Sequence, residues 1–299
     1  MDESSVTDGG ESGFLTSIAW TVGICIALFL IRKWIKGGQF TERVSAKGKI
    51  AVVTGANTGI GLETVRELNI RGAKVYMLCR SEARAQEARI KLVKMGCDAT
   101  RLIYEQCNLA SFKSIRECAK RIENAESHID ILINNAGIMF YPKHELTEDG
   151  HEMTWQSNHL GPFLLTELLL PLIKKSEEGR IIDVSSMLHT HSGALDVSTI
   201  DDKASFGRTS PYNRSKLANV MHARELSRRI RSDGNNTVTV NSLHPGACAT
   251  ELSRHLPLIG KKPFTSIGDC ARKTESTVAL YDLACKQLYD YSLKAVGVA

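Results

Sequence analysis

Residues 49–61, KIAVVTGANTGIG, decide the fold of this chain. The apolar run that opens this stretch is typical of a buried strand, and three glycines follow it where a helical pattern begins. Glycines let the backbone approach a pyrophosphate, and the N-terminus of a helix offers free N–H groups to it. The spacing here is G-x-x-x-G-x-G rather than G-x-G-x-x-G, and a tight turn without a ligand would show the same pattern.

Strand-like and helix-like segments alternate from residue 49 onward. The strand-like runs are 49–54, 74–79, 101–107, 129–134, 180–185 and 237–243. The helical patterns are 60–71, 82–95, 111–124, 151–175 and 211–232. This order predicts an α/β fold, a doubly wound parallel sheet of Rossmann type with helices on both faces. The long polar loop at 186–210 is of a kind that often binds a ligand.

Composition narrows the class of protein further. The chain has 299 residues, 42% of them apolar, and a formal charge of +5, which are ordinary values for a globular protein. No basic run with interleaved aromatics accompanies the charge, so we expect no nucleic-acid partner. The eight cysteines form no C-x-x-C pair, so we expect free thiols and no metal site.

The N-terminal region has the pattern of a membrane anchor. Residues 14–31 contain no charged side chain, and as a helix they would cover about 27 Å, close to the hydrocarbon thickness of a bilayer. Acidic residues precede this run, while Arg32, Lys33 and Lys36 follow it, which predicts a single-pass protein whose C-terminal part is cytoplasmic. A mitochondrial presequence would avoid acids, so the endoplasmic reticulum is favoured. The alternative is a buried core helix or a peripheral hairpin.

The end of the second strand-like run bears on the choice of nucleotide. An acidic residue there would bind the ribose hydroxyls of NAD, but the sequence has Arg80. A guanidinium pairs with a 2′-phosphate, so NADP(H) is the predicted cofactor. Glu82 lies nearby and would weaken this preference, and a solvated arginine at a strand end is the alternative.

Tyr212 and Lys216 stand four residues apart in the helical pattern 211–232, and so share one helix face. An ammonium group beside the phenol would lower the pKa of Tyr212 from its usual value of about 10. Acid–base chemistry near neutral pH requires such a shift. The Y-x-x-x-K pattern is common, so it has little weight alone.

Taken together, six features resemble the short-chain dehydrogenase/reductase superfamily. They are Thr54–Gly61, Asn134–Gly137, Asn158, Ser185 with Ser186, Tyr212 with Lys216, and Pro245 with Gly246. Within that superfamily, residues 158–163 (NHLGPF) and 215–219 (SKLAN) look like the membrane-bound retinol dehydrogenase branch.

This resemblance implies roles for particular residues. Tyr212 would exchange a proton with the substrate oxygen, Lys216 would bind the nicotinamide ribose, and Asn158 would position a water. Ser186 would hold the substrate oxygen, with Ser185 as the less favoured alternative. The implied cofactor contacts are Gly55, Asn57, Thr58, Gly59, Ile60, Gly61, Arg80, Asn108, Leu109, Asn135, Ala136, Gly137, Tyr212, Lys216, Pro245, Gly246 and Thr250.

Two departures from the family's pattern lie beside these residues. Asn108 replaces the Asp that the family usually has near the adenine, and an amide can still bind there. Asp183 replaces the Asn that the branch often has just before the serine pair, and we expect it to lie behind the site.

The implied activity is that of an NADP-dependent oxidoreductase, an alcohol dehydrogenase or carbonyl reductase. Its substrate would be a lipophilic alcohol, retinol-like, steroid or lipid, with the corresponding aldehyde or ketone. A catalytically weak, membrane-tethered isoform that acts as a binding or dimerising subunit is the alternative, and a homodimer is left open. The expected organisation is an acidic tail (1–13), a transmembrane anchor (14–31), a basic linker (32–48) and a dinucleotide-binding catalytic domain (49–299).

The C-terminal part is shorter than the resemblance implies. Residues 247–268 show no convincing amphipathic helix, and no strand-like run follows Leu243. The helix-like tail at 274–294 looks like what usually follows a final strand. We therefore expect that roughly 30 residues of the family's pattern are absent near 265–268, that the last strand is missing, and that the strand at 237–243 is an exposed edge. A short but self-sufficient variant is the alternative.

Overall fold

The computed structural model describes residues 9–36, 42, 44–246, 272–273 and 282–298. The chain divides into two compact units, Met1–Thr41 and Glu42–Ala299. This boundary falls inside the linker expected at 32–48.

Within the first unit the structure describes helix α1, Gly9–Lys36. The side chains at 16–30 are exposed along it, including Trp20 and Phe29. Among the residues that the structure describes, no helix combines the length and the apolar character needed to cross a bilayer. The membrane anchor expected at 14–31 is therefore not confirmed and stays a prediction.

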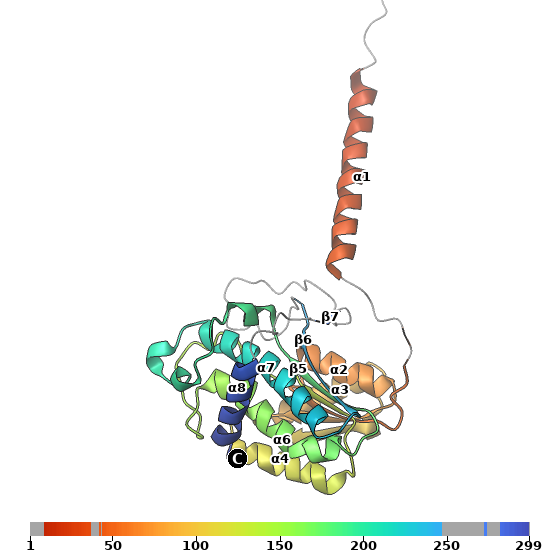
Figure 1. Ribbon diagram of the computed structural model, residues 1–299. Coiled ribbons are helices and arrows are strands. Elements are labelled where there is room, and N and C mark those ends of the chain that lie inside the picture. Colours follow the sequence, from red (N-terminus) through yellow and green to blue (C-terminus); the bar gives the residue numbers. More distant parts are fainter. Residues whose placement is uncertain (1–8, 37–41, 43, 247–271, 274–281, 299) are drawn as a thin grey trace, which may run out of the picture. The chain divides into compact units, whose positions relative to one another are not determined.

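The second unit is built on one sheet with the strand order β3-β2-β1-β4-β5-β6-β7. Figure 1 shows this sheet among its helices, with β5, β6 and β7 labelled. The strands are β1 Ile50–Thr54, β2 Lys74–Cys79, β3 Leu102–Gln106, β4 Ile131–Asn134, β5 Gly179–Val184, β6 Val238–His244 and β7 Arg272–Lys273. From β3 to β6 every neighbouring pair is parallel. The chain order reverses between β1 and β4, and in such sheets ligands bind at the carboxyl ends of the strands on either side of this switch point.

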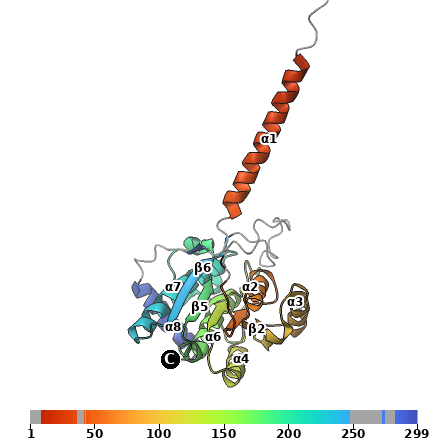
Figure 2. The same cartoon turned by 90° about the vertical axis from the view of Figure 1, so that its right-hand side faces the viewer.

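Helices cover both faces of the sheet, as the alternating pattern predicted (Figure 2). Helices α2 (Gly59–Ile70) and α3 (Glu82–Lys94) pack on one face. Helices α4 (Phe112–Ala125), α6 (Gly161–Ile173) and α7 (Ser210–Ser232) pack on the other. The doubly wound α/β fold is thus confirmed.

The helix expected at 151–175 is interrupted. It begins as α5 (Met153–Trp155), widens into the π-turn η2 (Gln156–Leu160), and continues as α6. Two features explain the interruption. Pro162 cannot donate a backbone hydrogen bond. Gly161 lies so close to the Leu109 backbone that a Cβ atom at Gly161 would be 2.4 Å from the Leu109 carbonyl oxygen.

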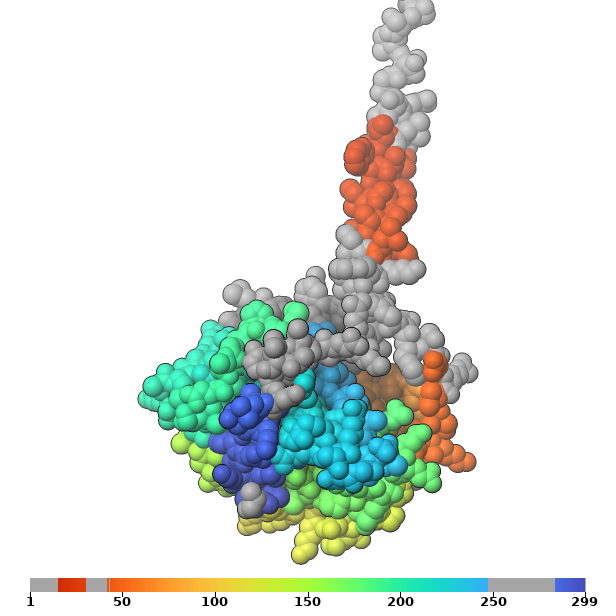
Figure 3. Space-filling view, viewed as in Figure 1, coloured from red at the N-terminus to blue at the C-terminus, as the bar shows by residue number. Residues whose placement is uncertain are grey.

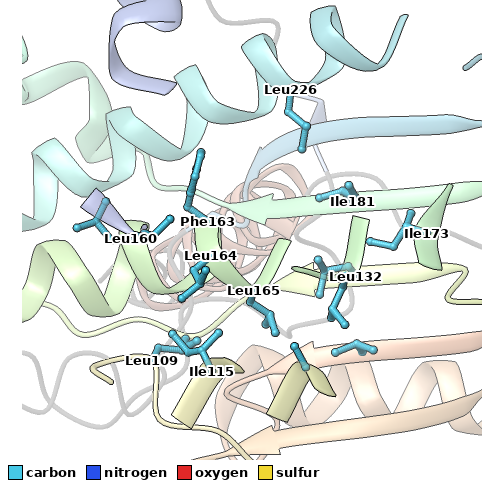
Figure 4. Close-up of a cluster of buried hydrophobic side chains, with 14 of the residues drawn as sticks. Leu109, Ile115, Leu132, Leu160, Phe163, Leu164, Leu165, Ile173, Ile181 and Leu226 are labelled. Atoms are coloured by element: carbon cyan, nitrogen blue, oxygen red, sulfur yellow. The ribbon is translucent and has the colours of Figure 1, made fainter. Parts of the chain in front are cut away.

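The larger core cluster lies between the sheet and the second helical face. Figure 4 shows Leu132 and Ile181 from the sheet facing Phe163 and Leu164 from α6, with Leu226 from α7 beside them. The tail expected to be helical forms α8 (Asp282–Ala295), which packs along α7 and adds three side chains to this cluster (Figure 3). These are Cys285, Leu288 and Tyr289.

The outer edge of β6 has limited pairing within the described residues. Only Leu243 and His244 pair there, with the two-residue antiparallel strand β7. Residues 247–271 and 274–281, which include the expected omission near 265–268, lie outside the described part of the chain. The shortening of the C-terminal part is therefore not tested.

Candidate active site

The glycine turn after β1, residues 55–61, has no side chain at three of its positions, and we call it the cradle. Gly55 and Gly59 have φ values of 64° and 55°, a region that favours glycine. A Cβ atom at Gly61 would lie 2.3 Å from the Gly55 carbonyl oxygen and 2.5 Å from Asn135 Nδ2. Only glycine fits at this position, because the backbone of the turn and the Asn135 side chain fill the space a side chain would need.

The turn is tied to the end of β4 by hydrogen bonds. Thr54 Oγ1 accepts hydrogen bonds from the backbone N–H groups of Asn135 and Ala136, both at 2.9 Å. Asn135 Nδ2 in turn donates to the Thr54 carbonyl oxygen at 2.8 Å. These contacts hold the strand ends together at the switch point.

The cradle fits a nucleotide pyrophosphate. Thr58, the N-cap of α2, makes no side-chain cap hydrogen bond, so the first N–H groups of the helix have no side-chain acceptor there. Such an N-terminus, with its positive dipole end, binds anions well. Four of the residues expected to contact the cofactor lie at this junction of turn and helix: Asn57, Thr58, Gly59 and Ile60.

The other expected nucleotide contacts follow neighbouring strands. Arg80 is exposed directly after β2, beside β1 in the sheet. Asn108 follows β3, and its Oδ1 accepts a hydrogen bond from the Ala110 N–H at 3.3 Å, while Leu109 is buried. Pro245 is buried and Gly246 has a φ of 82° after β6. Thr250 lies outside the described residues.

Lys216 is a buried lysine held by the end of β5. Its Nζ donates to the Val184 carbonyl oxygen at 2.8 Å, and its own carbonyl oxygen accepts from Ser185 Oγ at 2.7 Å. The side chain is only 3% exposed. Burial lowers the pKa of Lys216 to about 8, while the charge of Asp183 acts to raise it. Ser185 therefore anchors the α7 backbone, which favours Ser186 as the serine that faces the site.

Tyr212 lies one helical turn before Lys216, whose Nζ is 5.6 Å from the centre of the phenol ring. Burial raises the pKa of Tyr212, and its hydrogen bond with Ser186 acts to lower it. The expected lowering of this pKa by Lys216 is thus wrong for this structure, because desolvation of the phenolate dominates. The ring also contacts Phe140, at 6.0 Å between centroids.

Asn158 is placed by the π-turn η2. Its Oδ1 accepts from the Ile138 N–H at 2.8 Å, and its Nδ2 donates to the Ile138 carbonyl oxygen at 2.9 Å and to Ser215 Oγ at 3.1 Å. A Cβ atom at Gly137 would lie 3.3 Å from Asn158 Oδ1 and 3.5 Å from Lys216 Nζ. The structure therefore gathers Asn158, Lys216 and the loop after β4 around Gly137.

Sequence reasoning missed several residues that build this site. Thr54 joins β1 to β4, and Ser215 links Asn158 to α7. Thr54 lies in the motif Thr54–Gly61 and Ser215 in the motif 215–219, so the motifs themselves could have indicated both residues. It also missed His222, whose Nδ1 lies 2.8 Å from Asp183 Oδ2, because nothing in the sequence connects these two positions.

Comparisons with known proteins find similar sequences and a similar fold. The sequence profile of the family described as short chain dehydrogenase matches residues 49–258. Retinol dehydrogenase 13 of Homo sapiens is 43% identical over 239 residues, which cover 78% of this chain and 69% of that protein. Retinol dehydrogenase 14 of Mus musculus is 41% identical over 251 residues, which cover 80% of this chain and 74% of that protein. The crystal structure of an uncharacterized protein from Mycobacterium paratuberculosis matches with a TM-score of 0.70 at 29% identity, covering 87% of this chain and 98% of the other.

Replacing Gly61 with alanine tests the cradle. The added Cβ would collide with the backbone of the turn, so we expect Gly61→Ala to raise the Kd for NADPH by about tenfold or more, or about 1.4 kcal/mol. Titration of the full chain in detergent micelles, followed by NADPH fluorescence, measures this. Gly23→Ala is the matched control, since a Cβ there meets no atom of the described part of the chain within 4 Å. Equal affinity in both variants would contradict the proposed cradle.

Proposed function

The chain belongs to the short-chain dehydrogenase family, and we propose that it is an NADP(H)-dependent oxidoreductase for lipophilic alcohols and their aldehydes or ketones. That it is an oxidoreductase related to retinol dehydrogenases follows from its relatives. The observation that carries the finer proposal is the buried arrangement of Tyr212, Lys216 and Asn158 at the switch point of the sheet.

In the proposed mechanism the nicotinamide, when bound, supplies or accepts the hydride. Tyr212 exchanges its phenolic proton with the substrate oxygen, and Ser186 holds that oxygen by a hydrogen bond. The raised pKa of Tyr212 keeps its phenol neutral, which is the form that donates a proton during carbonyl reduction. Lys216 holds its ammonium group on the Val184 carbonyl, one turn from the phenol.

Asn158 connects the loop after β4 to α7. Its amide group binds both polar backbone groups of Ile138 and reaches Ser215 on α7. This fixes the spacing between the loop after β4 and the helix that presents Tyr212. We further propose that Asn158 positions a water in the site.

The preference for NADP(H) over NAD(H) is proposed from Arg80. Family members use NAD(P), and an arginine that follows β2 is suited to a 2′-phosphate. The guanidinium is always charged and presents a planar set of donors. Its exposure leaves it accessible to a ligand.

The proposed substrate is retinol-like, with steroids and lipid aldehydes as close seconds. We propose that residues 14–31 anchor the chain in a membrane, with the catalytic unit cytoplasmic and the endoplasmic reticulum as the favoured compartment. The uncharged sequence at 14–31 and the exposed apolar side chains of α1 support this part of the proposal. The alternative of a catalytically weak binding or dimerising subunit is less favoured, because the residues proposed for catalysis come together in the structure.

Removing the phenolic hydroxyl tests the chemistry. We expect Tyr212→Phe to abolish turnover of retinal and NADPH in detergent micelles while leaving the Kd for NADPH within about twofold, because the hydroxyl acts on the substrate oxygen. Tyr104→Phe is the matched control and should keep full activity, since its buried hydroxyl has no hydrogen-bond partner among the residues that the structure describes. Near-normal turnover by Tyr212→Phe would show that another group handles the proton.

Reversing the charge of Arg80 tests the choice of cofactor. A hydrogen bond to a charged group contributes about 1.5–3 kcal/mol, so we expect Arg80→Asp to weaken NADPH binding roughly 10- to 150-fold relative to NADH. Lys91→Asp on the following helix, α3, makes an equal change of charge at an exposed position and should leave the ratio unchanged. An unaltered NADPH/NADH ratio in Arg80→Asp would show a merely solvated arginine.

A further inference from the structure

A buried carboxylate lies behind the proposed catalytic residues and has no role in their chemistry. Asp183, on β5, is 2% exposed. Its Oδ1 accepts from Asn134 Nδ2 at 2.8 Å, and its Oδ2 lies 2.8 Å from Nδ1 of the equally buried His222 on α7. A buried charge is retained only where partners compensate its loss of hydration. Asn134 and His222 are the partners that compensate the buried carboxylate of Asp183.

The position of Asp183 in the strand connects it to Lys216. The next residue, Val184, accepts the hydrogen bond from Lys216 Nζ, and Ser185 binds the Lys216 carbonyl. The carboxylate thus belongs to a continuous segment that holds the lysine by backbone and side chain. Its negative charge opposes the effect of burial on the pKa of Lys216.

His222 lies in an aromatic environment and contacts Asp183 through Nδ1. Its ring packs against Phe163 of α6 and stacks on Tyr289 of α8, with centroid distances of 5.1 and 5.9 Å. In the described part of the chain, Nε2 of His222 has no hydrogen-bond partner. Burial lowers the pKa of His222, but the charge and hydrogen bond of Asp183 outweigh it and the pKa is raised.

The other titratable groups near His222 do not replace Asp183. His159, from the π-turn η2, has its pKa lowered to about 3 by burial and by His222, so it is neutral. Glu167 of α6 binds the Tyr289 hydroxyl of α8 and adds a smaller negative field. Asp183 is therefore the carboxylate that pairs directly with His222 and also acts on Lys216.

We propose, on the basis of the function proposed above, that Asp183 is a positioning residue: through His222 it ties α7 to β5 directly before Val184 and Ser185, and so holds the Lys216 ammonium group at the end of β5. His222 holds the carboxylate in place through its Nδ1 contact. Asp183 touches neither substrate nor cofactor in this account. It acts through Lys216 alone.

Direct titration of the lysine tests this. The full chain, labelled with ¹³C at the lysine Cε and held in detergent micelles, gives a Lys216 signal identified by its loss in Lys216→Arg. We expect Asp183→Asn to lower the apparent pKa of Lys216 by about one unit, because an opposite charge nearby shifts a pKa by about 1–3 units. The alkaline limb of kcat for retinal reduction should move to lower pH by a similar amount.

Two further variants separate charge from packing. His222→Gln keeps an N–H donor for Asp183, so the pKa of Lys216 should stay unchanged, and a lowered Lys216 pKa in this variant would overturn the positioning role. This variant alone carries the test if Asp183→Asn does not fold. Asp130→Asn is the matched control, because Asp130 is 3% exposed at the opposite end of the sheet, where Lys49 binds it, and it should leave the Lys216 titration unchanged.

The outcomes distinguish this inference from the proposed function. An unchanged Lys216 titration in Asp183→Asn, or an equal lowering in Asp183→Asn and His222→Gln, would overturn the positioning role. A lowered Lys216 pKa together with normal turnover by Tyr212→Phe would support the positioning role and contradict the proposed chemistry instead.

Discussion

The attachment of α7 to the end of β5 is the interaction on which the rest of the site depends. Residues 183–186 make successive contacts with that helix: a carboxylate to His222, a carbonyl and a hydroxyl to Lys216, and a hydroxyl to Tyr212. Because side chains alternate along a strand while a helix repeats every 3.6 residues, these contacts fix both the rotation and the height of α7. The phenol and the ammonium group are thereby placed at the switch point of the sheet, where the glycine turn also ends.

Burial gives this attachment its chemical consequence. Loss of hydration disfavours the charged form of Lys216 and of Tyr212, so it lowers one pKa and raises the other. The raised pKa favours the neutral phenol, which is the form that the proposed mechanism uses as a proton donor. For Lys216, the charge of Asp183 acts against the effect of burial. The same dry environment strengthens each remaining electrostatic interaction at the site.

The sequence predicted the six parallel strands and the helices between them, because hydrophobic periodicity and glycine turns are local signals. The sequence also named residues that meet in the fold: Thr54 binds Asn135, and Asn158 and Lys216 lie beside Gly137. It did not predict the π-turn, which arises where Gly161 meets the Leu109 backbone, nor the Asp183–His222 pair. Both depend on contacts between segments distant in the chain. The direction of the Tyr212 pKa was missed for the same reason, because burial is a property of the packed domain.

The transfer of deuterium tests the central claim, that this fold places a nicotinamide and a lipophilic carbonyl for direct hydride exchange. The full chain in detergent micelles would be incubated with retinal and NADPH carrying deuterium at C4 of the nicotinamide, with the two C4 faces labelled separately. The account predicts that one of the two labelled forms delivers a single deuterium to the carbinol carbon of the alcohol, with no hydrogen taken from solvent at that carbon. Tight NADPH binding without any deuterium in the product would contradict it and would favour a binding subunit.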